Sequence, residues 1–274
     1  MLEKTAIITG ASSGIGRAAA MALAKEGYRV VLAARRLEKL ETLAESIRSG
    51  GGEALAIQTD LGESRMIEEL VKAALDATGR IDLLVNNAGF GRLIWLEEQH
   101  LEEDIAAQIQ VNLTGSLQLT RAVLPTMLAQ QGGQIVFISS VAGFVGVPTY
   151  SIYSATKYGI RGFAQSLRRE LRGKGIRISV VYPGAVATEF DQQAGVDWKT
   201  TRVTPGWLLL SAEEVAEEIV RVVKRGKNRV ILPRVMNLAI WGNIFFPGLV
   251  GWLLSRSFYR EKGKTVAWNS KDQG

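Results

Sequence analysis

The chain has 274 residues, of which 47% are apolar, which is enough for one α/β domain with a small appendage. It has no cysteine, which excludes disulfides and thiolate metal sites, and its single histidine, His100, disfavours a His-based metal site or a Ser-His-Asp triad, so no metal is expected. The net charge of +6 is uneven, because residues 221–274 hold 11 Lys and Arg against 2 Asp and Glu, a net +9 that leaves −3 for the first 220 residues.

Short apolar runs rich in β-branched residues alternate with segments of helical periodicity. The runs expected to be strands are 6–9, 30–33, 54–58, 83–86, 135–139, 178–182 and 229–232. The segments expected to be helices are 15–26, 37–48, 64–78, 101–127, 154–172 and 212–224. Runs with little polar alternation are typical of parallel strands that helices cover on both faces. The pattern therefore predicts a doubly wound α/β domain over residues 1–232.

Two stretches break this alternation. Residues 189–211 have no clear period and are expected to form a substrate loop within the domain. Residues 233–274 are apolar and basic, and are expected to form a C-terminal extension.

The first strand runs into a glycine-rich turn, Thr9-Gly-Ala-Ser-Ser-Gly-Ile-Gly16, and then into a helix. Glycines let a backbone turn sharply and approach a pyrophosphate, and a helix N-terminus offers free N–H groups and the positive end of its dipole. A tight strand-to-helix turn without a ligand is the alternative, but the place of this turn after the first strand favours phosphate binding. The residues expected to contact a dinucleotide here are Gly10, Ser12, Ser13, Gly14, Ile15 and Gly16.

The end of the second strand carries arginines where an NAD site usually places an acid. The sequence there is Ala33-Ala34-Arg35-Arg36, and no acid follows before Glu38. Arg35 in that place suits the 2′-phosphate of NADP through charge-assisted hydrogen bonds. The alternative is that Arg35 and Arg36 are solvated residues at the start of a helix. The pattern favours NADP(H) as the cofactor.

Further motifs follow in order: Asn86-Asn87-Ala88-Gly89, Ser140, Tyr153-Ser-Ala-Thr-Lys157, and Pro183-Gly184 with Thr188. Together with the glycine turn they resemble the short-chain dehydrogenase/reductase family, from about residue 5 to residue 188. The resemblance implies a Rossmann-type three-layer fold with a seven-stranded parallel sheet, and a homodimer or homotetramer formed through helices 101–127 and 154–172. It also implies cofactor contacts from Asp60, Leu61, Asn87, Ala88, Gly89, Tyr153, Lys157, Pro183, Gly184, Val186 and Thr188.

The resemblance also assigns catalytic roles. Tyr153 would be the general acid/base, and Lys157 would hold the nicotinamide ribose and lower the pKa of the phenol. Ser140 would bind the substrate oxygen, and Asn112 would anchor a water in a proton relay. His100 is expected to be a solvated residue at the start of a helix.

The residue types suit the reduction of a carbonyl, which needs a hydride at carbon and a proton at oxygen. A tyrosine phenol has a pKa near 10, and a nearby cation lowers it. Tyr153 and Lys157 are spaced i, i+4, which places them on one face of a helix. Ser140 follows a strand end, where open α/β sheets bind ligands, and Ser139 is the fallback for its role. A Tyr-x3-Lys pair alone would usually be a surface pair, so the ordered set of motifs carries the assignment.

Apolar residues flank the motifs and indicate a lipophilic carbonyl or alcohol substrate. They are Phe90, Leu93, Trp95, Phe144, Val145 and Val147. Substrate contacts are expected from Ser140, Tyr153, Phe90 and Phe144. The alternative is that the apolar residues pack in the core or in a subunit interface.

Residues 235–255 form a stretch of 21 residues without a charge, with basic residues on both sides. A spanning helix needs about 20 apolar residues, but Asn237, Asn243, Pro247 and three glycines interrupt this one. A segment lying in a membrane interface and a helix pair that covers the pocket or packs in an oligomer both stay open. The expected location is cytoplasmic, with peripheral membrane contact left open. Nucleic-acid binding ranks last, because the main domain lacks interleaved aromatic and basic residues.

The leading prediction is an NADP-dependent oxidoreductase that acts on CH–OH groups. An epimerase or dehydratase on the same fold is the alternative among enzymes. A non-catalytic NADP-binding scaffold is the alternative from another class, and loss of Tyr153 or Lys157 would have favoured it, but both are present.

Overall fold

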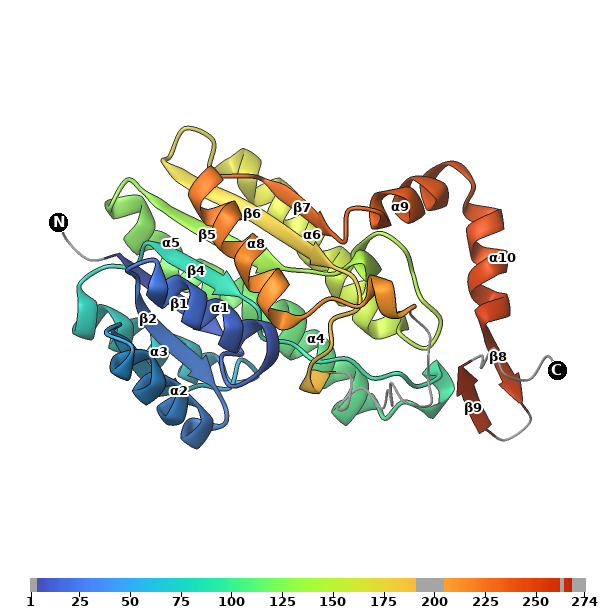
Figure 1. Ribbon diagram of the computed structural model, residues 1–274, viewed down its shortest axis with the longest axis horizontal. Coiled ribbons are helices and arrows are strands. Elements are labelled where there is room, and N and C mark those ends of the chain that lie inside the picture. The colour runs from blue at the N-terminus through green and yellow to red at the C-terminus, as the bar shows by residue number, and fades with distance from the viewer. Residues whose placement is uncertain (1–3, 191–204, 262–263, 268–274) are drawn as a thin grey trace.

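A single parallel sheet forms the centre of the molecule (Figure 1). The computed structural model describes residues 4–190, 205–261 and 264–267. Seven strands follow the order β3-β2-β1-β4-β5-β6-β7. They are β1 (Thr5–Thr9), β2 (Arg29–Ala34), β3 (Ala54–Gln58), β4 (Leu83–Asn86), β5 (Gly133–Ile138), β6 (Ile176–Pro183) and β7 (Arg229–Leu232). All seven predicted strands are present, which confirms the doubly wound fold.

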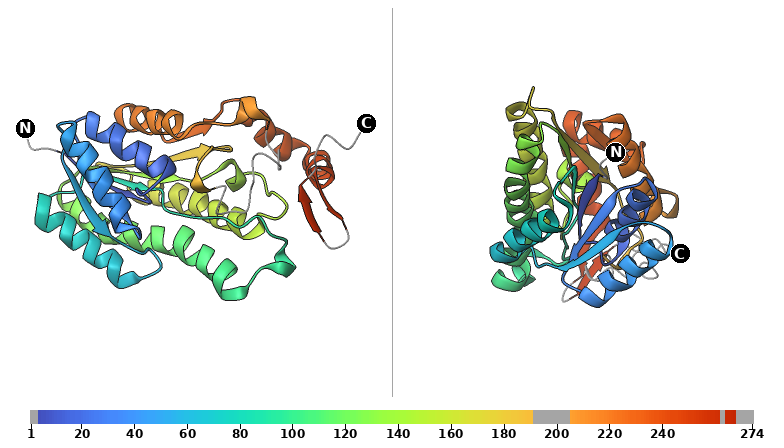
Figure 2. Two further views of the ribbon diagram at one scale, coloured as in Figure 1. Left: turned by 60° about the horizontal axis from the view of Figure 1, so that its bottom comes forward. Right: turned by 90° about the vertical axis from the view of Figure 1, so that its left-hand side faces the viewer.

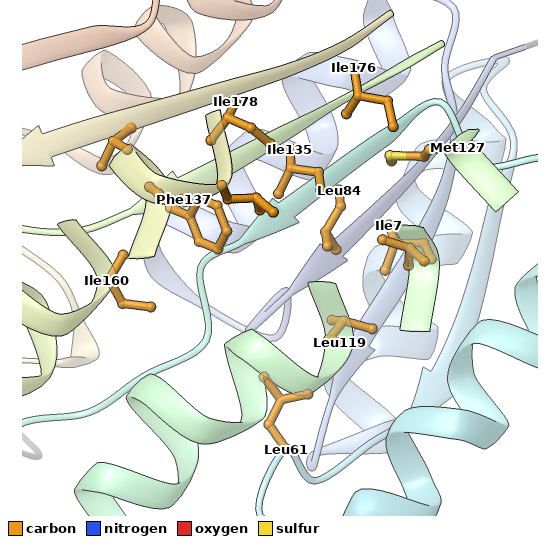
Figure 3. Close-up of a cluster of buried hydrophobic side chains, with 14 of the residues drawn as sticks. Ile7, Leu61, Leu84, Leu119, Met127, Ile135, Phe137, Ile160, Ile176 and Ile178 are labelled. Carbon is orange, nitrogen blue, oxygen red and sulfur yellow. The ribbon is translucent and has the colours of Figure 1, made fainter. Parts of the chain in front are cut away.

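Helices cover both faces of the sheet and make the three layers (Figure 2). One face carries α1 (Gly14–Lys25), α2 (Leu37–Ser49) and α8 (Ala212–Arg225). The other carries α3 (Ser64–Thr78), α5 (Ser116–Ala129) and α6 (Ser151–Glu170). Because successive side chains of a strand point to opposite faces, Ile7 of β1 packs under the second group and Ala6 and Ile8 pack under the first. Figure 3 shows the cluster around Ile7, Leu84, Phe137 and Leu119.

The helix predicted over 101–127 is present but is not a regular α-helix. It runs from residue 101 to residue 129, and two segments have the wider π-helical turn, η2 (Leu101–Ala106) and η3 (Gln110–Gly115), on either side of α4 (Ala107–Ile109). π-Helical turns inside α-helices occur frequently at functional sites. Helix α6 begins three residues before the predicted 154, so Tyr153 lies in its first turn.

The predicted C-terminal extension starts with two helices, α9 (Met236–Phe245) and α10 (Pro247–Ser257), which meet at a bend of 118°. The short hairpin β8 (Phe258–Glu261) and β9 (Lys264–Ala267) follows. In Figure 1 these elements lie beyond the carboxyl ends of the sheet strands, and α10 stands apart from the sheet. Within the described ranges no single helix is long and apolar enough to cross a membrane, and only the bent pair α9 and α10 reaches that length and composition together. Most of the predicted substrate loop, residues 191–204, lies outside the described residues.

The strand order places a crevice between β1 and β4. From β1 the chain builds β2 and β3 on one side, and from β4 it builds β5, β6 and β7 on the other. The loops that leave the carboxyl ends of β1 and β4 therefore diverge, and ligands of open α/β sheets bind at such a point.

Candidate active site

The turn after β1 is tied to the end of β4 by one threonine. The Thr9 hydroxyl oxygen accepts hydrogen bonds from the backbone N–H groups of Asn87 and Ala88, both at 3.0 Å. The Asn87 side-chain amide donates to the Thr9 carbonyl oxygen at 2.9 Å. These bonds fix the two loops that border the crevice, so the Asn87 side chain supports this edge of the sheet.

The glycines of this turn allow two close approaches. Gly10 has a φ of +66°, in the left-handed region that favours glycine. A Cβ on Gly16 would lie 2.3 Å from the Gly10 carbonyl oxygen and 2.6 Å from the Asn87 amide nitrogen. Gly16 therefore lets α1 start directly against β1, which aims the N-terminal N–H groups of α1 at the crevice.

Two cations converge on one carboxylate beside this turn. The Arg36 guanidinium lies 2.8 Å from a Glu189 carboxylate oxygen, and the Lys39 ammonium lies 2.9 Å from the other. Arg36 also donates to the hydroxyl oxygens of Ser12 and Ser13, at 3.0 and 2.9 Å. The hydrogen bonds from Lys39 and from Arg36 lower the pKa of Glu189 to about 2. Arg36 and Lys39 thus form a pair of cations that holds one carboxylate.

Arg35, the arginine expected at this place, also borders the crevice, with its side chain exposed. Its carbonyl oxygen accepts a hydrogen bond from Gln58 at 3.0 Å. The contacts to Ser12, Ser13 and Glu189 come from Arg36, which the sequence analysis gave only a solvated role.

Ser140 lies just past the end of β5. Its backbone is extended, and its hydroxyl oxygen accepts from the N–H of Ala142 at 3.1 Å and lies 3.4 Å from the Pro183 carbonyl oxygen. The fallback residue, Ser139, is buried and donates to the Lys157 carbonyl oxygen at 3.2 Å. Ser140 is thus partly open to the crevice, while Ser139 holds the first half of α6.

Tyr153 and Lys157 face each other across one turn of α6. The Lys157 ammonium lies 5.4 Å from the centre of the Tyr153 ring and donates to the Ile138 carbonyl oxygen at 3.0 Å. Lys157 is buried, and the loss of solvation lowers its pKa to about 8. The Tyr153 ring packs between the rings of Tyr150 and Phe190, with centroids 5.4 and 5.5 Å away. Tyr153 and Lys157 are therefore held by contacts with other side chains and the backbone, and they are not a solvated surface pair.

Asn112 lies in the second π-helical segment and is buried. Its side-chain oxygen accepts from the N–H of Phe90 at 2.9 Å, and its amide donates to the Phe90 carbonyl oxygen at 2.7 Å. The side chain therefore clamps the backbone that follows the Asn87-Ala88-Gly89 segment. Its role in a water relay stays a prediction.

One cavity of about 560 Å³ joins these elements. Its lining includes most of the predicted site residues. They are Gly10, Ser12, Ser13, Gly14, Ile15, Arg35, Asp60, Leu61, Asn87, Ala88, Gly89, Phe90, Ser140, Tyr153, Lys157, Pro183, Gly184, Val186 and Thr188. Gly16 and Asn112 do not line the cavity, but they contact Gly10 and Phe90, which do. Val186 also pairs with Leu210, which holds the Pro183 to Thr188 segment in place.

Phe144, expected to contact substrate, lies elsewhere. The side chain is buried, its ring centre lies 4.7 Å from that of Tyr182, and the Arg161 guanidinium lies 4.0 Å from the Phe144 ring centre. Phe144 is therefore a core residue, as in the alternative interpretation of these apolar residues. Trp95 does not line the cavity either, whereas Leu93, Val145 and Val147 do.

Several residues of the cavity wall were not predicted from the sequence. Tyr150 and Phe190 flank Tyr153, and Met236, Ala239 and Leu254 come from α9 and α10. The apolar tail was the only sequence signal for the last three, and a helix pair over the pocket was one of the two alternatives left open for it. The inner sides of α9 and α10 thus form part of the site.

Comparison with known proteins agrees with this geometry. The short chain dehydrogenase family model matches residues 4–198. A 3-oxoacyl-[acyl-carrier-protein] reductase of Synechocystis sp. is 40% identical over 72% of this chain and 80% of its own length. A ketoacyl reductase of Nostoc sp. is 37% identical over 84% of this chain and 78% of its own.

Solved structures share the fold over nearly the whole chain. A short-chain dehydrogenase from Sphingobium yanoikuyae in complex with NADPH has a TM-score of 0.78 and 31% identity, and the match covers 96% of this chain and 98% of the other. One from Burkholderia phymatum in complex with NAD has a TM-score of 0.81 and 28% identity, over 90% and 95%. The sequence match, the sheet order and the arrangement of Ser140, Tyr153 and Lys157 lead to one assignment: the chain belongs to the short-chain dehydrogenase family of oxidoreductases.

Proposed function

We propose that this oxidoreductase interconverts a carbonyl and an alcohol on a lipophilic molecule, with NADP(H) as cofactor and Tyr153 as general acid/base. The observation that carries the proposal is that Ser140, Tyr153 and Lys157 line the same cavity as the glycine-rich turn, Arg35 and Arg36. Chemistry and cofactor binding would thus share one continuous space.

The residues present fit a dinucleotide. The turn from Gly10 to Gly14 and the N-terminus of α1 suit a pyrophosphate, and Asp60 and Leu61 lie in the wall where an adenine would be held. Arg36 and Lys39 already hold a carboxylate by charge-assisted bonds, so we propose that they, with Arg35 nearby, hold the 2′-phosphate. Structural neighbours solved with NADPH support this choice, although the Burkholderia phymatum protein was solved with NAD.

The bound cofactor would supply or accept the hydride at the substrate carbon. Tyr153 would then donate the proton to the carbonyl oxygen, or remove it from the alcohol in the reverse direction. Ser140 is open to the cavity and would donate a hydrogen bond to the same oxygen as charge develops. Lys157 would keep a positive charge 5.4 Å from the Tyr153 ring centre, which favours the phenolate.

The substrate end of the cavity is largely apolar. Phe90, Leu93, Val145 and Val147 line it, and Met236 and Leu254 close it from the C-terminal helices. Such a wall favours a substrate with an acyl chain or a ring system next to the carbonyl. Because relatives are 3-oxoacyl and ketoacyl reductases, a 3-oxoacyl thioester is the first compound to test.

A substrate panel read by NADPH absorbance tests the proposal. The panel should contain 3-oxoacyl thioesters of increasing chain length, aromatic ketones and a short polar ketone, each assayed with NADPH and with NADH. We expect kcat/KM to rise with chain length and to be larger with NADPH. Equal efficiency with both cofactors would contradict the role of Arg36 and Lys39, and a preference for the polar ketone would contradict the lipophilic substrate.

We further propose that the chain assembles as a homodimer or homotetramer through the long helices from 101 to 129 and from 151 to 170. Exposed apolar side chains on them, Leu101, Ile109, Leu128 and Tyr158, support this. Light scattering at increasing protein concentration would test it, and a monomer throughout would contradict it.

A further inference from the structure

We propose that the outer face of α9 and α10 docks onto the surface of an anionic lipid bilayer. This outer face consists of Val235, Leu238, Trp241, Ile244, Phe245, Phe246, Leu249, Trp252 and Leu253. The described part of the chain has sixteen large apolar side chains that are exposed, and these nine fall within 19 consecutive residues. Concentrated apolar exposure of this kind marks an interaction site, whereas single exposed apolar residues are ordinary.

The outer face is rich in aromatic side chains, which suit a membrane interface. Phe245 is 66% exposed and Trp241 is 53% exposed, and their rings stack with centroids 5.6 Å apart. Trp252 presents its ring to the Arg256 guanidinium, 5.5 Å away. In a membrane interface a Trp ring lies at the level of the lipid headgroups, and an Arg side chain extends its guanidinium to the same level. A Trp and an Arg side by side therefore suit such an interface.

The opposite side of the two helices is attached to the protein. Ile240 is buried, and Met236, Val250 and Leu254 pack against the main core. Asn243, one of the polar residues that interrupt the stretch, donates to the Phe144 carbonyl oxygen at 3.2 Å. The pair therefore turns a polar group inward and its aromatic groups outward, which a helix pair that only closes a pocket would not need.

Charge selects the bilayer over a second copy of this chain. Residues 235–255 carry no charge, while the C-terminal extension as a whole, residues 233–274, holds 6 Lys and Arg against 2 Asp and Glu, a net +4. Arg234 and Arg256 border the outer face and are exposed. Pairing two copies through this face would bring two basic segments together, whereas an anionic lipid surface attracts each basic residue near it.

The bend favours docking on the surface over spanning. At 118° the two helices cannot form one straight rod, and each is shorter than the roughly 20 residues that a span needs. The inner residues Met236, Ala239 and Leu254 line the cavity, so docking would place the apolar end of the cavity next to the bilayer. A lipophilic substrate would then enter from the lipid phase, a consequence that rests on the proposed function, although the docking itself does not.

Vesicle sedimentation with the full chain, without cofactor or substrate, tests the docking separately from the oxidoreductase activity. The vesicles would contain phosphatidylglycerol and phosphatidylcholine in one series and phosphatidylcholine alone in another. The double substitution Trp241→Ser/Trp252→Ser removes two aromatic side chains from the outer face. Trp207→Ser is the control, because Trp207 is also exposed but lies outside α9 and α10.

We expect the wild type and the Trp207→Ser variant to bind the anionic vesicles, with weaker binding at high salt or on neutral lipid. The double variant should bind more than about tenfold less, because it loses two aromatic contacts with the interface. Circular dichroism would confirm that it is folded. Absence of wild-type binding at low salt, or equal binding by the double variant, would overturn the proposal. So would a double variant that changes a dimer to a monomer in ultracentrifugation while vesicles bind neither protein, because the face would then belong to a second copy.

Discussion

Glu189→Gln would test whether the cationic site beside the glycine turn holds the 2′-phosphate. In the structure the Glu189 carboxylate occupies Arg36 and Lys39, at 2.8 and 2.9 Å. A 2′-phosphate must therefore displace this carboxylate before it can use the same donors. The amide of glutamine keeps the size of the side chain but removes the negative charge, so NADPH should bind more tightly.

The expected gain in NADPH affinity depends on how exposed the three charged side chains are. The side chains of Arg36, Lys39 and Glu189 are 39, 47 and 40% exposed, so solvent screens both ion pairs. Pairs of this kind contribute roughly 0.2–1 kcal/mol each, and about 1 kcal/mol for the two corresponds to about fivefold in Kd. Because the carboxylate is ionised above a pH of about 2, the gain should not vary with pH in the neutral range.

Isothermal titration calorimetry with NADPH and with NADH would measure this gain in affinity. The Kd of NADPH should fall about fivefold in Glu189→Gln, while the Kd of NADH, which has no 2′-phosphate, should stay the same. Glu41→Gln removes an exposed carboxylate from α2, the helix that carries Lys39, and is the control for a general change in charge. An unchanged NADPH affinity, or an equal gain for both cofactors, would refute the competition between Glu189 and the phosphate.

Three further predictions concern the reacting centre and the turn. Tyr153→Phe should bind NADPH normally and lose nearly all turnover, since only the phenol proton is removed; near-normal activity on a true substrate would contradict the mechanism. Burial lowers the pKa of Lys157 to about 8, so its ammonium is present below that pH and is lost above it; initial rates of reduction should decline above about pH 8, and a flat profile to pH 10 would contradict the role of the cation. Gly16→Ala would place a Cβ 2.3 Å from the Gly10 carbonyl oxygen, which should cost roughly 1–3 kcal/mol of stability and weaken NADPH binding; thermal denaturation measures the first effect, and an unchanged Tm would show that α1 can move away.

The sequence predicted the strands and most of the cavity wall because both depend on local patterns. Apolar runs identify strands buried on both faces, and the place of a motif after a strand fixes it at the sheet edge. Ser140 follows from that rule, while Tyr153 and Lys157 followed from the resemblance to the short-chain dehydrogenase/reductase family, and all three line the cavity. The wide turns around Asn112 were missed, since a period of 3.6 residues does not distinguish an α-helix from one that contains π-helical segments.

Contacts between segments that are far apart in the chain could not be predicted from the sequence. Whether Arg35 or Arg36 faces the glycine turn depends on how the chain leaves β2, and Glu189 comes from 153 residues further along. Phe144 was given to the substrate on its type and position, yet its ring packs on Tyr182 and Arg161 in the core. Each of these outcomes depends on tertiary packing, which overrides the local preference of a residue.

Because all seven strands run the same way, the site residues gather at their carboxyl ends, and the amino ends of the strands form the opposite edge of the sheet. The chain turns there at Gly27, Gly51, Gly79 and Gly173, and the positive φ of these glycines disfavours any other residue, so a handle belongs beside them and not in their place. β1 also starts at that edge, at Thr5. An attachment handle or a reporter dye placed there would hold the protein on a sensor chip with its cavity and its C-terminal helices facing the solution. The polarity of the sheet thus provides an immobilisation geometry suited to vesicle and cofactor measurements alike.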